Sequence, residues 1–295
     1  MSQAVSPTTG KPYGVQRACA VLSLARSSFY AGQVAPTPRA DGKRGPKPKW
    51  SDEELLGFIM HDLERSAFHG EGHRKVWARL RIMDGVRVSR KRVLRIMREN
   101  RLLSPYRTCG QPASGHEGEI ITSEPNLMWG TDGSKVLTVD EGWVWIFATL
   151  EHWNSECLGW HVSKAGTRFQ ALEPISMALG EIFGGVNCGV AGGLQLRMDH
   201  GSQYTSDDFR KQIKFWGIVP SYAFIEQPQT NGVPERFFRT LKEQAIYGRV
   251  FKNAEEVSQA VAPFVQAYNR SWRLERLGYL SPLEYRQASL TRMAA

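Results

Sequence analysis

The sequence predicts an α/β fold, a mixed five-stranded sheet with flanking helices, preceded by all-α helix-turn-helix units. Three observations carry this prediction. Basic residues gather in the N-terminal third, apolar residues recur at helical spacing before residue 105, and strand-like and helix-like segments alternate after it. The 295 residues are 41% hydrophobic and 23% charged, which is typical of a globular chain that buries a core.

Composition excludes several classes of protein. The longest uncharged apolar run, near residues 143–150, is far shorter than the roughly 20 residues of a membrane span. The N-terminal residues lack the basic-then-apolar pattern of a secretory signal. The cysteines are scattered, which fits neither a disulfide framework nor a zinc knuckle; they are Cys19, Cys109, Cys157 and Cys188. We therefore exclude membrane, secreted and zinc-finger proteins and expect a reducing, cytoplasmic setting.

The net charge of +9 is unevenly distributed. Residues 1–110 hold 21 Lys and Arg against 9 Asp and Glu, whereas residues 111–295 hold 17 against 20. This split indicates a basic module for a polyanion, joined to a near-neutral module with another task. An evenly solvated basic face is the alternative that charge alone leaves open.

The first predicted unit, residues 1–32, is a helix-turn-helix. Small and apolar residues follow helical spacing from Val15 to Tyr30 and break at Ser23, although a simple core hairpin gives the same outline. Residues 33–50 carry four prolines, two glycines and five Lys or Arg. That composition does not pack a core and predicts a basic, proline-rich linker.

A second helix-turn-helix unit, predicted to bind DNA, occupies residues 51–110. Its first helix begins at Ser51 with Glu54 as the matching residue of a capping box, and its second runs from His73 to Met83. The third follows Ser89 and has an apolar stripe opposite a basic face made of Lys91, Arg92, Arg95 and Arg98. Such a helix suits the DNA major groove. A plain amphipathic helix is the alternative.

Strands and helices alternate in the second module. The predicted strands are 127–139, 143–153, 157–162, 194–198 and 218–221, the first three forming an antiparallel meander. The predicted helices are 167–182, 206–216 and a long one from Gly232. Pro174 predicts a kink in the first of these helices or a later start. This element order is that of a ribonuclease-H-like mixed sheet.

Three carboxylates fall at informative places in this order. Asp132 lies within the first strand, Asp199 ends the fourth, and Glu235 stands near the start of the long helix. An acid in a buried strand is costly unless it is paired or binds a cation, and converging acids raise one another's pKa unless metal ions neutralise them. Oxygen-only ligation suits Mg²⁺, and two such ions can clamp an in-line phosphoryl displacement. Ordinary surface or capping acids remain the alternative at this point.

The sequence motifs around Asp199 and Glu235 are characteristic of one family. DHGSQYTS followed by PQTNGVPERFFRTLK resembles the signature of insertion-sequence DDE transposases, the bacterial relatives of retroviral integrases. The tail AYNRSWRLERLGYLSPLEYR is similar to the end of that family, and RACAVLSLARSSFY and residues 51–105 are similar to its N-terminal pieces. The resemblance covers most of the chain.

The resemblance implies a function and a site. Asp132, Asp199 and Glu235 would be the catalytic and metal-binding triad for two Mg²⁺ ions, with Mn²⁺ as a substitute. The activity would be cleavage at the element's terminal inverted repeats, which frees a 3′-hydroxyl, followed by attack of that hydroxyl on a second phosphodiester. The core would span residues 118–250 and a helical tail 251–295. Double-stranded DNA, as element ends and target, and a homo-oligomer of at least two chains would be the partners, with no membrane, in the nucleoid-associated bacterial cytoplasm.

Four further residues near the triad are candidate DNA contacts: Gln203, Asn231, Arg239 and Lys242. Arg239 and Lys242 follow Glu235 on one side of the helix. Asn231 belongs to the uncharged segment 229–232, which is otherwise a simple loop with a helix cap. Gly133, Ser134 and the segment EHWNSE depart from the family's usual pattern and leave target preference open. Two rival functions remain, a DNA-binding regulator and a ribonuclease-H-like nuclease without strand transfer.

Overall fold

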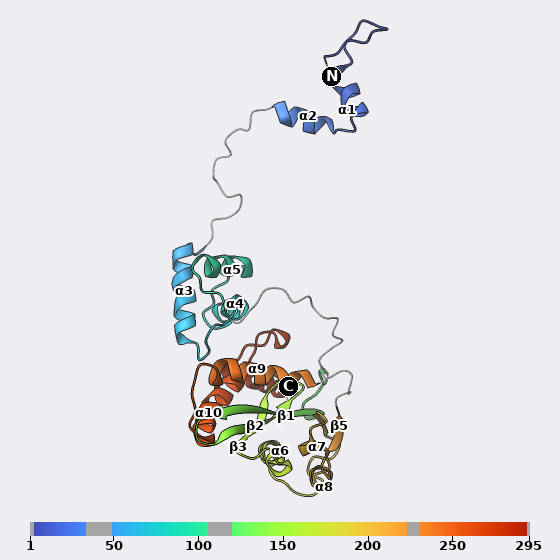
Figure 1. Cartoon of the computed structure of the whole chain (residues 1–295). Helices are drawn as coiled ribbons and strands as arrows, with labels where there is room; N and C mark the ends of the chain where they lie inside the picture. The colour runs from blue at the N-terminus through green and yellow to red at the C-terminus, as the bar shows by residue number, and fades with distance from the viewer. Residues whose placement is uncertain (1–2, 34–48, 106–119, 223–230, 294–295) are drawn as a thin grey trace. The chain divides into compact units, whose positions relative to one another are not determined.

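The computed structural model describes residues 3–33, 49–105, 120–222 and 231–293. The chain divides into two compact units, Met1–Trp50 and Ser51–Ala295, which are described separately (Figure 1). Most of the predicted linker at 33–50 lies outside the described residues, as do Cys109, Gln229 and Thr230. Within the described residues, no helix combines the length and the apolar character that crossing a membrane requires.

The first unit contains two short helices, α1 (Gly14–Val21) and α2 (Arg26–Gln33). Between them Ser23 adopts a left-handed conformation with φ of 52°, and the amide of Leu24 donates to the carbonyl of Cys19 at 2.9 Å. The predicted break at Ser23 is therefore confirmed, because this reversal ends α1 and redirects the chain into α2.

The second unit begins with three helices, α3 (Asp52–Arg65), α4 (His73–Ile82) and α5 (Arg90–Glu99). Both predicted caps form. Ser51 Oγ accepts from the amide of Glu54 at 3.1 Å while the Glu54 carboxylate accepts from the Ser51 amide, and Ser89 Oγ accepts from the amide of Arg92. The apolar faces meet in a core made of Leu55, Ile59, Val76, Leu80, Val93, Ile96 and Met97.

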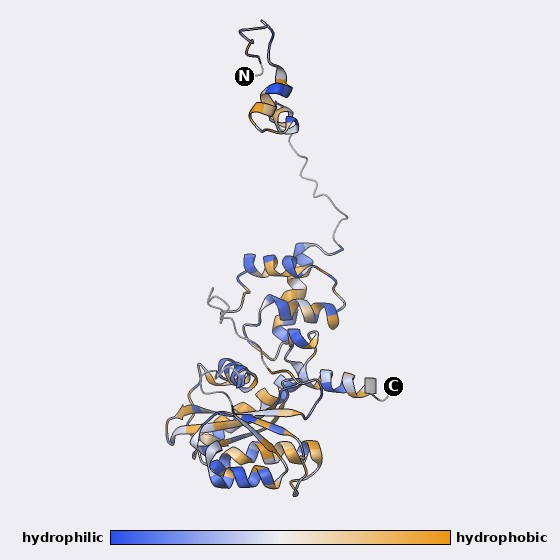
Figure 2. Cartoon of the chain, turned by 90° about the vertical axis from the view of Figure 1, so that its right-hand side faces the viewer, coloured by the Kyte–Doolittle hydropathy of each residue, from blue (hydrophilic) through white to orange (hydrophobic). Residues whose placement is uncertain are grey.

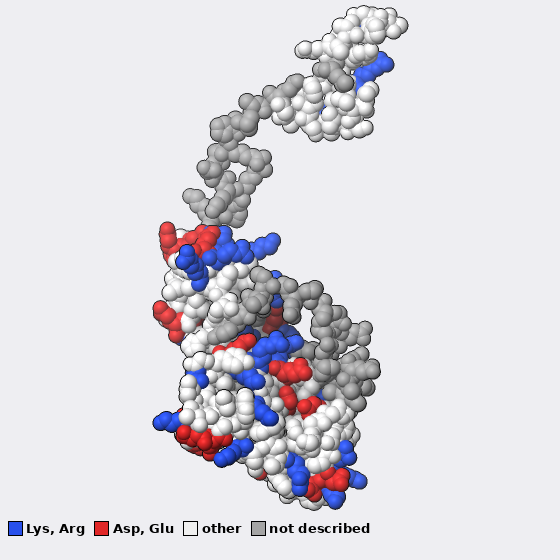
Figure 3. All heavy atoms as spheres, viewed as in Figure 1, with Lys and Arg blue, Asp and Glu red and all other residues white. Residues whose placement is uncertain are grey.

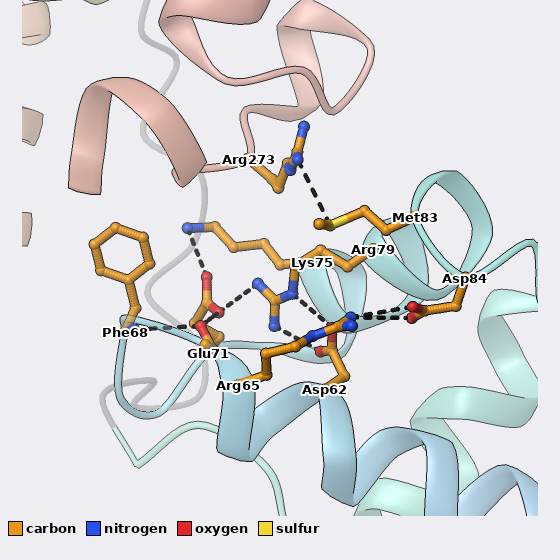
Figure 4. Close-up of polar contacts among 10 residues, drawn as sticks. Asp62, Arg65, Phe68, Glu71, Lys75, Arg79, Met83, Asp84 and Arg273 are labelled. Atoms are coloured by element: carbon orange, nitrogen blue, oxygen red, sulfur yellow. Dashed lines mark hydrogen bonds and ion pairs between the residues drawn. The ribbon is translucent and has the colours of Figure 1, made fainter. Parts of the chain in front are cut away.

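A buried ionic cluster fixes this three-helix part (Figure 4). The guanidinium of Arg79 donates to both carboxylate oxygens of Asp62, at 2.8 and 2.7 Å, and also to Glu71. All three side chains are buried. Such charges are tolerated only when each is paired, so the cluster ties α3, α4 and the segment between them together. Asp62 lies on the buried face of α3 with Leu55 and Ile59, but helical periodicity alone did not predict its partners.

The sheet contains five strands: β1 (Met128–Thr138), β2 (Gly142–Glu151), β3 (Cys157–Ser163), β4 (Gln195–Met198) and β5 (Val219–Tyr222). Their order is β3-β2-β1-β4-β5. The first three strands pair antiparallel, while β4 runs parallel to both β1 and β5. The predicted mixed five-stranded sheet with flanking helices is thus confirmed, and its order is the ribonuclease-H-like one.

Helices cover both faces of the sheet (Figure 1). On one face lie α6 (Arg168–Phe183), the short α7 (Ser202–Thr205) and α8 (Asp207–Phe215), packed in a core that includes Trp129 and Phe209. On the other lie α9 (Gly232–Leu241) and α10 (Ala254–Ser271), in a core with Val136 and Phe237. Hydrophobic and hydrophilic residues both occur along the strands between these layers (Figure 2). A 3₁₀ turn (Glu275–Leu277) and α11 (Pro282–Met293) follow α10.

Some local predictions were wrong. Helix α6 does not start late but runs through the buried Pro174, whose carbonyl packs against the Cα of Gly159 on β3 where any side chain would clash. On the same helix, the apolar Phe169 and Met177 are exposed. The short helix α7 at Ser202–Thr205 was not among the predicted elements, and the long helix predicted from Gly232 becomes a π-helix over Lys242–Ile246.

Candidate active site

Strand β1 supplies the first acid from the centre of the sheet. Side chains alternate between the two faces of a strand, so Gly130, Asp132 and Val136 share one face. Val136 lies in the core with Phe237 of α9, which identifies this face as the one covered by α9. Asp132 is partly buried there, and its Oδ1 accepts a hydrogen bond from the amide of Gly133 at 2.8 Å. One carboxylate oxygen is therefore fixed.

The parallel pairing of β1 with β4 brings in the second acid. Gly130 pairs with Arg197 in this ladder. Continuing the register by two residues places Asp132 level with Asp199, which directly follows β4. Residues level with each other on parallel strands point to the same face, so both carboxylates rise on the α9 side. Asp199 is partly buried, and its Oδ1 accepts from the amide of Gly201 at 2.9 Å.

Helix α9 brings the third acid to β1. Asn231, just before the helix, donates from Nδ2 to the carbonyl of Thr131 at 3.3 Å. Pro234 packs on Gly130, where a Cβ atom would lie 2.8 Å from Pro234 Cγ. These two contacts dock the first turn of α9 beside Asp132. Glu235 stands in that turn with an exposed side chain, and no hydrogen bond to another described residue holds it.

The pKa of Asp132 depends on its own burial and on the charges of the other two acids. Burial raises its pKa to about 7, and the charges of Asp199 and Glu235 push the pKa in the same direction. The Gly133 amide and the charge of Lys242 act in the opposite sense. Asp132 thus feels two neighbouring carboxylates, and Lys242 is close enough to offset part of their charge.

The donor set fits a hard divalent cation. Three carboxylates offer only oxygen, and in both aspartates one oxygen is held by a backbone amide while the other is left for ligation. Among the described residues, no three His, Cys, Asp or Glu side chains lie close enough together, as they stand, to hold a metal ion. The two aspartates are the restrained part of the set, and the exposed Glu235 is the part with freedom to move.

Tyr204 of α7 also lies near the acids, which the sequence did not predict. Its side chain is fully buried. Burial raises the pKa of its hydroxyl well above the usual value, and the charges of Asp132 and Asp199 contribute. The buried Tyr204 hydroxyl therefore stays neutral in the field of the two aspartates. Nothing in the motif DHGSQYTS distinguishes this tyrosine from an ordinary core residue.

The four predicted DNA contacts near the triad have different surroundings. Arg239 is exposed on α9, while Lys242 and Gln203 are partly buried, the latter beside Asp199 in α7. Asn231 is only 3% exposed and is engaged with Thr131. The predicted DNA contact through Asn231 stays a prediction. The hydrogen bond from its Nδ2 joins α9 to β1, while its Oδ1 has no partner among the described residues. Its side chain makes no helix-capping hydrogen bond either.

The basic face of α5 is partly neutralised. Lys91, Arg95 and Arg98 are exposed, and Arg92 is partly buried. Asp52 of α3 makes ion pairs with Arg92 and Arg95, each at 2.6 Å, and Arg95 also pairs with Glu99 at 3.0 Å. Acidic and basic side chains accordingly lie side by side over the three-helix part in Figure 3. Hydrogen bonds from Arg95 and then Arg92 lower the pKa of Asp52.

Family models match three parts of the chain. An HTH-like domain matches residues 67–108, and two integrase core domain models match residues 122–228 and 235–290. Together the core models take in all three acids.

The chain is also similar to curated relatives and, more distantly, to solved structures. The chain is 26% identical over 279 residues to "Transposase InsD for insertion element IS2A/D/F/H/I/K" of Escherichia coli, which covers 92% of this chain and 91% of that protein. It is also 26% identical to an Escherichia coli insertion element IS2A 48.2 kDa protein, of which it spans 66%. Similar structures include a simian T-cell lymphotropic virus intasome in complex with PP2A regulatory subunit B56 gamma, with a TM-score of 0.46 and 15% identity over 80% of this chain and 74% of that one. Another is the HTLV-2 integrase catalytic core domain in complex with magnesium, with a TM-score of 0.42 and 12% identity over 57% and 99%.

Proposed function

We propose that this chain, which belongs to the integrase-core transposases of insertion elements, cleaves and joins DNA ends with Asp132, Asp199 and Glu235 as its catalytic triad. The reaction is in-line displacement at phosphorus. In the first step a water oxygen attacks a phosphodiester at the element's end, and the 3′-oxygen leaves as a hydroxyl. In the second step that hydroxyl attacks a target phosphodiester, so that one P–O bond forms as another breaks.

The position of Asp132 carries this proposal. A carboxylate whose pKa is raised to about 7 by burial and by two neighbouring acids is poorly placed for stability alone. The fold nevertheless brings Asp199 level with it through the β1–β4 register and docks Glu235 beside it through Asn231 and Pro234. Such an arrangement is expected where cations bind between the acids.

Two Mg²⁺ ions, with Mn²⁺ as a substitute, would be held by the free oxygens of Asp132 and Asp199 and by Glu235. Divalent ions bound there would supply activation of the attacking oxygen and neutralisation of the phosphate charge. The chain's own residues orient the substrate. Arg239 and Lys242, on the helix after Glu235, hold the phosphate backbone, and Gln203 contacts the DNA beside Asp199.

We further propose that the α5 face binds the terminal inverted repeats, with Lys91, Arg92, Arg95 and Arg98 toward the duplex. The helix-turn-helix of residues 1–32 is a second DNA-binding unit in this scheme, the catalytic core spans 118–250, and the helical tail 251–295. Because two ends must be joined to one target, the active species is at least a dimer on DNA. A protein that acts on DNA in bacteria works in the cytoplasm at the nucleoid.

A labelled duplex carrying the element's end, identified by sequencing the genomic flanks for inverted repeats, tests the proposal. Wild type with Mg²⁺ should nick this duplex and join it to a second DNA. Asp132→Asn, Asp199→Asn and Glu235→Gln should each lose both steps and keep binding. Asp207→Asn, an exposed acid at the start of α8, is the matched control and should remain active.

The same assay separates the rival functions. A regulator binds the duplex but neither wild type nor variant cuts it. A nuclease without strand transfer cuts but yields no joined product. Substantial joining by any one of the three acid variants removes that residue from the triad.

A further inference from the structure

Gly130, two residues before Asp132, is the point at which three separate segments meet. A Cβ atom at this position would lie 2.8 Å from Nε2 of His152 and 2.8 Å from Cγ of Pro234. No ordinary side chain fits there without displacing one of them. We call this meeting of β1, the end of β2 and the first turn of α9 the Gly130 contact.

The Gly130 contact joins the neighbours of two of the acids. Gly130 shares its strand and its face with Asp132, and Pro234 directly precedes Glu235. Since the strand and the first helical turn are both stiff, the depth at which Pro234 rests on Gly130 sets the separation between Asp132 and Glu235. The imidazole of His152 bounds the same space, since its Nε2 would lie equally close to a Cβ atom of residue 130.

His152 is firmly anchored. It is fully buried, its amide donates to the carbonyl of Met128 at 3.1 Å, and its own carbonyl accepts from Arg276. Its Nδ1 lies 2.8 Å from the carbonyl of Ile120, which can only accept, so Nδ1 carries the proton. Burial lowers the pKa of this imidazole, which keeps the ring neutral.

The other ring nitrogen has a different environment. Nε2 is buried and has no hydrogen-bond partner among the described residues. A fully buried nitrogen without a hydrogen-bond partner lowers the stability of the fold, so the presence of a histidine here calls for a reason beyond packing. The edge of the ring that carries Nε2 is the edge that meets Gly130.

We propose that His152 is a positioning residue for the reaction, whose ring edge at the Gly130 contact holds Pro234 and thereby sets the position of Glu235 against Asp132. This inference rests on the proposed function, because it concerns the spacing of the proposed metal ligands. It assigns a role to the segment EHWNSE, which the sequence singles out and the triad does not use.

Three variants of the full-length protein test the role. His152→Asn keeps a donor for the Ile120 carbonyl but removes the ring edge. Gly130→Ala adds a methyl group to the filled space. The double variant places that methyl group where the ring edge was. His161→Asn is the matched control, since His161 on β3 is a partly buried histidine bonded to Gln170 at 2.5 Å, away from this contact.

The readout is Mn²⁺ affinity of the DNA-free protein by calorimetry, accompanied by a melting curve. We expect both single variants to bind Mn²⁺ about tenfold more weakly, a loss typical of residues that orient metal ligands. We expect the double variant to return close to the wild-type affinity, and the control not to differ from wild type. A purely structural role would lower the melting temperature without moving the affinity of the folded protein.

The outcomes separate cleanly. Equal Mn²⁺ affinity in wild type and in all three variants overturns the proposal, and so does a double variant as weak as Gly130→Ala. His152→Asn alone could unfold. If the double variant with Gly130→Ala then folds, the result supports the proposal; if the double variant also unfolds, the result contradicts it. If Mn²⁺ binding follows the expected pattern but wild type joins no DNA, the proposed function fails and the positioning role stands. If wild type joins DNA but the variants bind Mn²⁺ as tightly as wild type, the proposed function stands and the positioning role fails.

Discussion

Arg95 on the basic face of α5 lies 2.6 Å from a carboxylate oxygen of Asp52 at the start of α3. Asp52 also holds Arg92. Two of the four cations proposed to face DNA are therefore engaged within the protein when no DNA is present. Phosphate contacts by these arginines require exchange of one anionic partner for another, so they add less to affinity than their number suggests.

The first prediction concerns these ion pairs. Arg95→Ala should weaken end binding and reduce the slope of log K against log salt by about one. Asp52→Asn should act oppositely and strengthen binding to any duplex, because both arginines are released. Titrations of a labelled duplex over a range of salt measure both effects, with Lys214→Ala on α8 as the control. An unchanged slope for Arg95→Ala would place α5 off the DNA.

Loss of Asp62 should unfold the three-helix part more easily. Asp62→Ala leaves Arg79 buried with only Glu71 as a partner, and breaking a buried pair costs about 3–5 kcal/mol. Asp84→Ala is the matched control, since Asp84 pairs at 3.1 Å with an Arg65 that is half exposed and should cost about 1 kcal/mol or less. Urea unfolding of the full chain measures the difference. Equal losses would mean that the cluster contributes no more than a surface pair.

The acid cluster should make the metal-free protein less stable as pH rises. The pKa of Asp132 is raised from 3.8 to about 7 on folding. Between these values the unfolded chain releases a proton that the folded chain keeps, so the free energy of unfolding falls as pH rises from about 4 to 7. Asp132→Asn should remove this fall and melt at a higher temperature than wild type at pH 8 without metal.

Asp140→Asn, at the exposed turn after β1, serves as the control for this pH series and should follow wild type. Adding Mg²⁺ should restore wild-type stability at pH 8 and leave Asp132→Asn unaffected. Identical pH profiles for wild type and Asp132→Asn would show that this carboxyl titrates normally.

Two glycines should respond oppositely to the same substitution. Gly159→Ala places a methyl group against the carbonyl of Pro174 and should cost about 1–3 kcal/mol or more, because both the strand and the helix must shift. Gly180→Ala, within α6 and facing open space, should gain about 0.5–1 kcal/mol from helix propensity. Thermal melts of the two variants measure this contrast. A harmless Gly159→Ala would contradict the close approach of α6 to β3.

Sequence patterns predict the elements whose causes are local. The capping box at Ser51 and Glu54, the break at Ser23 and the alternation along β1 each depend on residues a few positions apart, and all three are present. The three acids were proposed as a site because a family motif surrounds Asp199 and Glu235, and Asp132 lies within a predicted strand.

The remaining features depend on which segments meet. Periodicity does not reveal that Asp52 faces Arg95, 43 residues further on, or that Arg79 is buried against Asp62. Nor does it reveal that Asn231 donates a hydrogen bond to the carbonyl of Thr131, 100 residues earlier. Pro174 was interpreted from its own helix alone, and that window does not reveal the close approach of its carbonyl to Gly159 on β3. Such pairings follow from register and packing, which no short window of sequence contains.

The route by which the third acid arrives has a consequence during synthesis. Asp132 and Asp199 belong to strands that can pair as soon as β4 leaves the ribosome, but Glu235 reaches them only when α9 settles on Gly130 and Thr131. Under the proposed function, a nascent chain that has completed its sheet still lacks one of its three catalytic acids. The order of synthesis therefore delays the proposed DNA cleavage until α9 has folded onto the sheet.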